Sequence, residues 1–169
     1  MKKKIIVLAL VALVCASAFA AVDGRTSIGL NYSYNDGNYF GLTTDTVGFI
    51  NNSSFGYYVG TDAAFGIGNV NAYKIHMQFA PVYRYMIANT AMSIDLALGL
   101  SASYVDADLL KFGVGGYLGA EYRINELTSL MIGAKMGSDF VNIPLKNNPD
   151  VTIEGDFYIT PYIGVGFCY

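Results

Sequence analysis

Apolar residues alternate with small or polar residues along much of this chain. The stretch AMSIDLALGLSASY, residues 91–104, is a clear case. One of its faces holds Met92, Ile94, Leu96, Leu98, Leu100, Ala102 and Tyr104, and the other holds Ser93, Asp95, Ala97, Gly99, Ser101 and Ser103. A period of two positions is typical of a β-strand whose faces meet different surroundings. Helical spacing is not evident after the first 20 residues.

The same alternation predicts eight strands, at residues 25–35, 39–50, 54–67, 71–86, 90–104, 111–123, 128–140 and 155–169. Two kinds of connecting segment, which we call breaks, alternate between consecutive predicted strands. NNSS (51–54), IANT (87–90) and INEL (124–127) are short, whereas NDGN (35–38), GNVN (68–71), VDADLL (105–110) and a longer stretch at 142–154 form the other set. Antiparallel neighbours place the two sets at opposite ends of the strands, with the C-terminus on the side of the first set.

An even number of antiparallel strands of about 10 residues is typical of a transmembrane β-barrel, and the rival is a soluble barrel such as a lipocalin. In a soluble barrel the apolar face lines a cavity and the outside carries the charges. Here nearly every charge lies on the face that is otherwise Gly, Ser and Ala. Such small residues suit a crowded barrel interior and make a poor exterior in water.

Aromatic residues of the apolar face gather near the strand ends. Those near the longer breaks are Phe40, Phe65, Tyr73, Tyr104, Phe112 and Phe157, and those near the short breaks are Phe55, Tyr83, Tyr85, Tyr122, Phe167 and Tyr169. The middles of the strands hold Val59, Ile75, Met77, Leu96, Leu98 and Leu118. Two aromatic belts around an aliphatic band match the two interfaces of a bilayer. The sequence therefore predicts an all-β fold, an eight-stranded antiparallel transmembrane β-barrel in contact with lipid.

The first 20 residues, MKKKIIVLALVALVCASAFA, differ from the rest. Three lysines precede an apolar run of about 14 residues and the small-residue pattern Ala18-Phe19-Ala20, which is typical of a secretory signal peptide cleaved after Ala20. We expect a signal peptide at 1–20 and one barrel domain at 21–169. That domain would carry seven basic against thirteen acidic residues, which argues against nucleic acid as a partner. Only Cys168 would remain, so no internal disulfide is expected.

The C-terminal segment YIGVGFCY keeps the alternation to the last residue, with Ile163, Val165, Phe167 and Tyr169 on one face. This pattern, together with GAEYRINELTSLMIGAK (119–135), resembles the small eight-stranded outer-membrane barrels of the OmpA transmembrane-domain and OmpX type. The resemblance implies an outer-membrane location and a last strand that pairs with the first. It also implies that these four residues are the recognition signal for the barrel-assembly machinery.

The inward face carries the charges, and buried charges need partners. The predicted network comprises Asp62, His76, Arg84, Asp95, Glu121, Arg123 and Lys135. A turn centred near Asn69 places Asp62 opposite His76, and a turn centred near Asp108 places Asp95 opposite Glu121. Arg84 is then expected diagonal to Asp95, with Arg123 and Lys135 flanking Glu121.

Pro81 and Pro161 fall inside predicted strands, although a closed barrel has no free edge on which to place a proline. Each proline lacks the backbone N–H that would donate a hydrogen bond to a neighbouring strand. We therefore expect a bulge or a bridging water at both positions.

The candidate chemistry is sparse. Asp62 and His76 could form a catalytic dyad, but they point into the lumen and no serine lies in an elbow motif, so a buried ion pair is the preferred interpretation. No metal, cofactor or catalytic site is predicted, and the chain is not expected to be an enzyme. The first functional hypothesis is a monomeric structural or surface-interaction barrel whose polar lumen is plugged by its own side chains. The alternative is a narrow pore or small-molecule transporter of the OmpW-like kind, in which the salt bridges would form a gate.

Overall fold

Eight long strands make up the described part of the chain. The computed structural model describes residues 23–34, 37–50, 53–68, 72–106, 108–145 and 151–169, so the predicted signal peptide at 1–20 lies outside it. The strands are β1 (Gly24–Tyr34), β2 (Asn38–Phe49), β3 (Phe55–Gly66), β4 (Tyr73–Met86), β5 (Met92–Val105), β6 (Leu109–Arg123), β7 (Thr128–Pro144) and β8 (Thr152–Cys168). All eight predicted strands are confirmed. None of the described residues lies in a helix long and apolar enough to cross a membrane.

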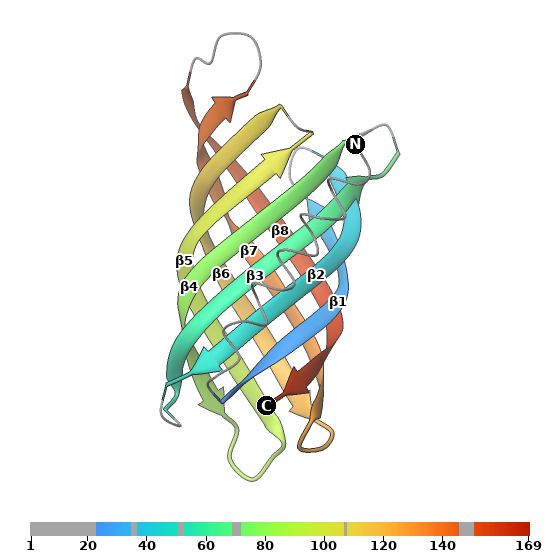
Figure 1. Ribbon diagram of the computed structural model, residues 1–169, viewed down its shortest axis with the longest axis vertical. Coiled ribbons are helices and arrows are strands. Elements are labelled where there is room, and N and C mark those ends of the chain that lie inside the picture. The colour runs from blue at the N-terminus through green and yellow to red at the C-terminus, as the bar shows by residue number, and fades with distance from the viewer. Residues whose placement is uncertain (1–22, 35–36, 51–52, 69–71, 107, 146–150) are drawn as a thin grey trace.

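The strands form one closed antiparallel ring in chain order (Figure 1). Closure joins β1 to β8, where Arg25 lies opposite Cys168 and Tyr34 opposite Ile159. Gly24 and Tyr169 complete this seam by exchanging two backbone hydrogen bonds of 3.1 Å. We call the end that holds Tyr169 and the β2–β3, β4–β5 and β6–β7 connections the turn side, and the opposite end the loop side.

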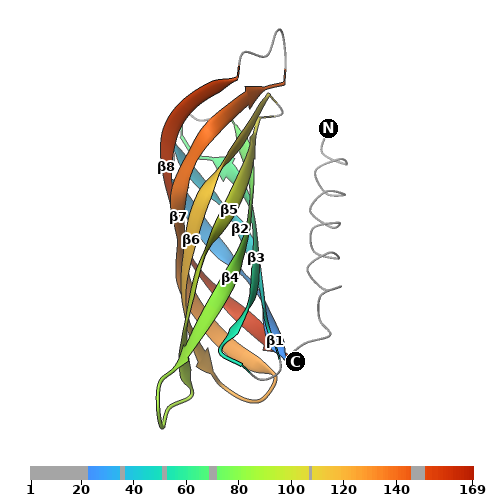
Figure 2. The ribbon, with the colours of Figure 1, turned by 90° about the vertical axis from the view of Figure 1, so that its left-hand side faces the viewer.

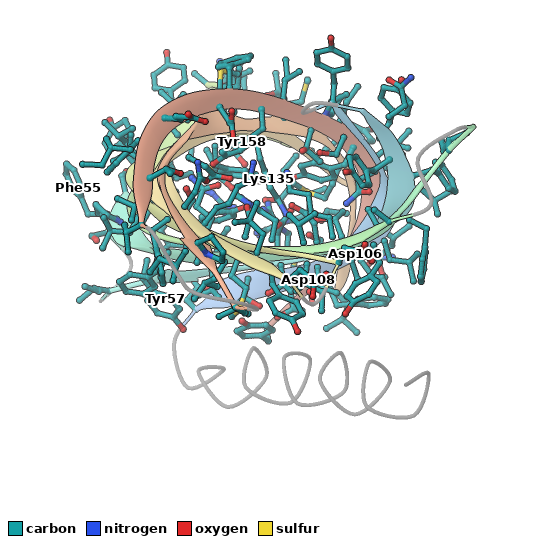
Figure 3. All side chains as sticks on the ribbon, turned by 90° about the horizontal axis from the view of Figure 1, so that it is seen from above. Phe55, Tyr57, Asp106, Asp108, Lys135 and Tyr158 are labelled. Carbon is teal, nitrogen blue, oxygen red and sulfur yellow. The ribbon has the colours of Figure 1, made fainter. Side chains whose placement is uncertain are left out.

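The two faces of the sheet differ as the alternation predicts. Residues from the predicted aliphatic band are exposed or half-buried on the outside, as are the aromatic residues of both predicted belts. Figure 3 shows Phe55 and Tyr57 outside the ring of strands and Lys135 and Tyr158 inside it. The outer surface is therefore an apolar cylinder, and the interior is a polar core filled by side chains.

Two features of the ladders differ from the prediction. The register continues unshifted past Pro81 and Pro161, and the ladder simply lacks pairs there on one side: Pro81 toward β5 and Pro161 toward β1. The expected bulges at the prolines are thus wrong. Register shifts occur instead near Gly113 and between Asp139 and Val141, where β7 and β8 continue into the stretch predicted as a long loop.

Candidate functional site

Tyrosine rings occupy much of the barrel interior because glycines make room for them. A Cβ atom added at any of four inward-facing glycines would overlap a tyrosine side chain: Tyr58 at Gly60, Tyr117 at Gly119, Tyr162 at Gly133 and Tyr158 at Gly115. The rings of Tyr58 and Tyr117 stack with centroids 4.2 Å apart, and the hydroxyls of Tyr117 and Tyr162 are 2.9 Å apart. The small residues of the inward face thus create the space that the aromatic side chains fill.

Arg25, Arg84, Asp95 and Glu121 form what we call the turn-side cluster. Arg84 on β4 lies opposite Asp95 on β5, and its Nε and Nη2 donate to the two carboxylate oxygens over 2.7 and 2.8 Å. Arg25 on β1 reaches Glu121 on β6 with Nη1–Oε2 at 2.7 Å, and Asp95 with Nη1–Oδ2 at 3.2 Å. Since β1 neighbours only β2 and β8 in the ring, the Arg25 contacts cross the lumen.

The pairing predicted for this cluster is partly wrong. Asp95 lies opposite Gly119 rather than Glu121, whose partner on β5 is Ser93. Arg84 is directly opposite Asp95, not diagonal to it, and also donates to Glu121 over 2.8 Å. Arg123 flanks Glu121 at 3.7 Å as predicted, but its side chain is 44% exposed and lies at the mouth of the barrel. The two buried arginines therefore hold the two carboxylates together without direct cross-strand pairing between them.

Lys135, Asp45 and Asp62 form the central cluster. The Lys135 ammonium is 2.8 Å from Asp45 and 2.7 Å from Asp62, and it donates to Thr43 over 2.7 Å. Lys135 is on β7, whereas its partners are on β2 and β3, so these contacts also cross the lumen. All three charged side chains are almost completely buried.

Each central carboxylate has a further donor. Tyr58 donates its hydroxyl hydrogen to Asp45 over 2.9 Å, and Asn31 donates through Nδ2 to Asp62 over 3.0 Å. The predicted position of Lys135 beside Glu121 is wrong, because the β6–β7 register places Lys135 opposite Tyr117. The lysine instead connects the two halves of the ring.

His76, Ser103 and Asp139 form the loop-side cluster. Asp62 lies opposite His76 in the β3–β4 register, as predicted. The predicted ion pair between them is nevertheless replaced by other contacts: Asp62 binds Lys135 and Asn31, whereas Nδ1 of His76 lies 2.8 Å from the Ser103 hydroxyl. Ser103 also donates to Asp139 over 2.9 Å. The histidine therefore belongs to a hydroxyl–carboxylate chain and not to a dyad.

Arg25 and Asp45 are central to the network but were not among the predicted residues. The alternation of the sequence nevertheless indicates that both side chains point inward. Arg25 shares the parity of Ser27 and Asn31 on the first strand, and Asp45 shares that of Thr43 on the second. Both strands have weak alternation near these positions, since hydroxyl residues and glycines occupy both faces. A parity argument carried through all eight strands would have placed both side chains inside.

The buried charges of the described interior balance. Five are cationic and five are anionic: Arg25, Lys74, Arg84, Lys111 and Lys135 against Asp45, Asp62, Asp95, Glu121 and Asp139. Within the described ranges no three His, Cys, Asp or Glu side chains are grouped as metal ligands. The balance holds for the described interior as a whole: the turn-side cluster pairs two arginines with two carboxylates, whereas the central cluster has one lysine for two carboxylates. In both clusters the ion pairs connect opposite walls of the lumen.

Known proteins match this chain in fold. No family model matches it, and no curated protein sequence matches it significantly. Among solved structures, Neisserial surface protein A is similar with a TM-score of 0.63 and 12% identity, over 86% of this chain and 96% of that one. The outer membrane protein OprG from Pseudomonas aeruginosa gives a TM-score of 0.61 and 14% identity, over 88% and 97% of the two chains. Ail, the attachment invasion locus protein of Yersinia pestis, gives 0.54 and 14%, over 88% and 100%. The resemblance to small outer-membrane barrels is thus confirmed at the level of the fold.

Proposed function

We propose that this chain is an outer-membrane protein with a closed lumen, which acts as a structural or surface-interaction protein. The observation that carries this proposal is the two sets of ion pairs across the lumen, from Arg25 to Glu121 and from Lys135 to Asp45 and Asp62. An eight-stranded barrel has an interior that side chains just fill, so bonds between opposite walls leave no open path. The apolar outer surface supports lipid as the surrounding medium.

Two segments of the sequence support export of the chain and its assembly in the outer membrane. The signal peptide proposed at residues 1–20 would direct export, and Ile163, Val165, Phe167 and Tyr169 on β8 would be recognised by the barrel-assembly machinery. The last three of these positions alternate with Gly164, Gly166 and Cys168, so the signal is an uninterrupted apolar row. A monomer is the proposed state, because closure of the ring leaves no strand in the hydrocarbon that needs a partner subunit.

The names of two similar proteins, a surface protein and an attachment protein, support a role in surface contact. Ail has also been solved with the heparin analogue sucrose octasulfate. The described surface of this chain offers little to bind such a polyanion. Among the described residues the only exposed basic side chain is Arg123, which lies on the turn side.

Conductance of the refolded barrel in a planar bilayer tests whether the lumen is closed. The parent protein is expected to show no steady single-channel current. A variant that removes the central cation, Lys135→Ala, is the matched comparison, because it opens space at the middle of the lumen and leaves the outer surface unchanged. Steady conduction by the parent would overturn the closed-lumen proposal and favour the narrow pore.

Labelling of intact cells tests the location and the topology. In a Cys168→Ser background, Asp106→Cys places a thiol on the loop side and Glu126→Cys places one on the turn side, and both native side chains are exposed. A membrane-impermeant maleimide is expected to label only the Asp106→Cys variant on whole cells, and both variants after lysis. Labelling of Glu126→Cys alone on whole cells would reverse the topology, and labelling of neither would contradict exposure at the cell surface.

A further inference from the structure

The central cluster carries one more negative charge than positive charge. Lys135 is the cation that Asp45 and Asp62 share, at 2.8 and 2.7 Å. The balance of the whole interior hides this excess, because it includes Lys111, whose partner Asp156 is only half-buried. The remaining buried charges are equal in number: Arg25, Arg84 and Lys74 against Asp95, Glu121 and Asp139. The excess of one negative charge is therefore local to the centre of the lumen.

The hydrogen bonds to the two central carboxylates converge on one oxygen of each. Lys135 and Tyr58 both donate to Oδ1 of Asp45, over 2.8 and 2.9 Å. Lys135 and Asn31 both donate to Oδ1 of Asp62, over 2.7 and 3.0 Å. The Oδ2 atom of each carboxylate is buried and has no hydrogen-bond partner among the described residues. A buried charged oxygen without a donor is costly, so both Oδ2 atoms call for a positive partner.

Asn31 supplies a third bare oxygen beside these carboxylates. Its Nδ2 donates to Oδ1 of Asp62 and, over 3.2 Å, to the carbonyl of Leu42, and these two bonds determine the orientation of the amide. Oδ1 of the same amide is buried and has no partner in the described part of the chain. Because the two amide atoms share one carbon, this oxygen also lies next to Asp62. The Asn31 side chain is only 2% exposed, so bulk water does not satisfy it.

The three bare oxygens belong to three adjacent strands. Asn31 is on β1, Asp45 is on β2 and Asp62 is on β3, whereas Lys135 reaches them from β7. Figure 2 shows β7 on one wall of the barrel and β1 and β3 on the opposite wall. A cation held by these oxygens would therefore join β1, β2 and β3 from inside and leave the contacts of Lys135 in place.

The ligand atoms indicate the class of cation. Carboxylate and amide oxygens bind hard cations, whereas transition metals favour imidazole and thiolate donors. Within the described ranges no third His, Cys, Asp or Glu side chain is grouped with Asp45 and Asp62. A monovalent ion would neutralise the excess charge, whereas a divalent ion would reverse it. Mg²⁺ also gives up its water reluctantly, and these oxygens are almost closed to solvent.

We propose that the central cluster binds one small monovalent cation of the size of Na⁺, between Oδ2 of Asp45, Oδ2 of Asp62 and Oδ1 of Asn31. The ion and Lys135 together balance the two carboxylates. The folded barrel is then stabilised by sodium itself and not by ionic strength, because the site exists only when β1, β2 and β3 are in place. This binding site does not depend on the surface role of the protein.

Equilibrium unfolding by urea of the refolded barrel in phosphatidylcholine vesicles tests the site. NaCl replaces choline chloride at a constant total concentration, so that charge screening stays the same while the larger choline cannot fill the site. If one ion binds only the folded state, each tenfold rise in sodium above the dissociation constant lowers the unfolding constant by a factor of about ten. The urea midpoint is therefore expected to rise with sodium. Equal midpoints in the two salts would overturn the proposal.

Matched variants locate the effect in the central cluster. Asp45→Asn removes the excess charge and one ligand with little change of shape, and its urea midpoint is expected to be independent of sodium. Asp139→Asn makes the same change in the loop-side cluster and is expected to keep the full sodium dependence of the parent. Equal responses of the two variants would show that sodium acts elsewhere and would overturn the site.

A direct measurement of bound sodium does not depend on unfolding. Barrels refolded in NaCl and brought to equilibrium dialysis in phosphatidylcholine nanodiscs are expected to hold one sodium ion more than empty nanodiscs, measured by atomic emission. The absence of this excess would overturn the proposal. A proton on one of the carboxylates is the rival, because it would also balance the charge. It requires equal midpoints in the two salts and a midpoint that rises as the pH is lowered, and that result would replace the bound cation by a proton.

Discussion

Replacing Lys135 by Met is the sharpest test of the central cluster. The substitution removes the ammonium that lies 2.8 Å from Asp45, 2.7 Å from Asp62 and 2.7 Å from the Thr43 hydroxyl, and keeps a side chain of similar length. Both carboxylates are almost completely buried, and after the change Tyr58 would still donate to Asp45 and Asn31 to Asp62, but no cationic side chain would remain between them. They would then face each other with their charge uncompensated.

The expected cost follows from this arrangement. Breaking a buried ion pair by removing one partner destabilises a protein by about 3–5 kcal/mol, because the remaining charge has lost its compensation. Lys135→Met should lose at least this much, since two carboxylates share the one ammonium. Adding Asp62→Asn removes one of the two charges and should recover about 0.5–3 kcal/mol of coupling between the sites.

The assay is equilibrium unfolding by urea in lipid vesicles, followed by the shift in gel mobility between folded and heated protein. Thr43→Val is the control, because it removes one hydrogen bond to Lys135 and no charge, and should cost about 1 kcal/mol. An unfolding midpoint of Lys135→Met equal to that of the parent would refute the reasoning. Further destabilisation when Asp62→Asn is added to Lys135→Met would also refute it.

Three other results are expected. Leu98→Arg should destabilise the barrel by about 2–4 kcal/mol in the same unfolding assay, because Leu98 is 71% exposed in the lipid-facing band. Leu127→Arg, at a turn residue that is 69% exposed, should be tolerated, and equal effects would reject the membrane orientation. Deleting residues 167–169 should leave export intact but prevent assembly in the outer membrane, which fractionation and heat-modifiable mobility would detect; normal mobility would contradict the assembly signal. Arg84→Ala should lower the unfolding midpoint, raise conductance or both, and Asp95→Asn in the same background should partly restore the parent behaviour; unchanged behaviour in both assays would argue against a role for the turn-side cluster.

The fold follows closely from the sequence because a period of two positions determines both the strand and its two faces. The outward position of Leu98 and the inward position of Lys135 needed only this parity. The cross-strand partner of a residue is harder to predict than the face on which its side chain lies, because it depends on where the turn is centred. The prediction centred the β5–β6 turn near position 108, but Val105 lies opposite Leu109, which centres it at 107. A shift of one position in the centre moves the partner by two, and Asp95 therefore lies opposite Gly119 instead of Glu121.

Contacts across the lumen could not be predicted in this way. Lys135 meets Asp45 and Asp62 because the slant of the strands brings β7 opposite β2 and β3 at this depth. That geometry depends on the stagger accumulated around the whole ring, to which every turn and every register shift contributes. The bulge between Asp139 and Val141 was not visible in the alternation either.

The lumen-crossing ion pairs also bear on how the barrel forms. Arg25 and Glu121 are 96 residues apart in the chain, and Lys135 and Asp62 are 73 apart. A barrel with only some of its strands inserted would therefore hold charges whose partners have not arrived, and an unpaired charge in hydrocarbon costs several kcal/mol. Partial insertion is penalised until both ends of the chain are in place. The internal charges thus make insertion and closure cooperative, and they favour a single late transition over a gradual addition of hairpins to the membrane.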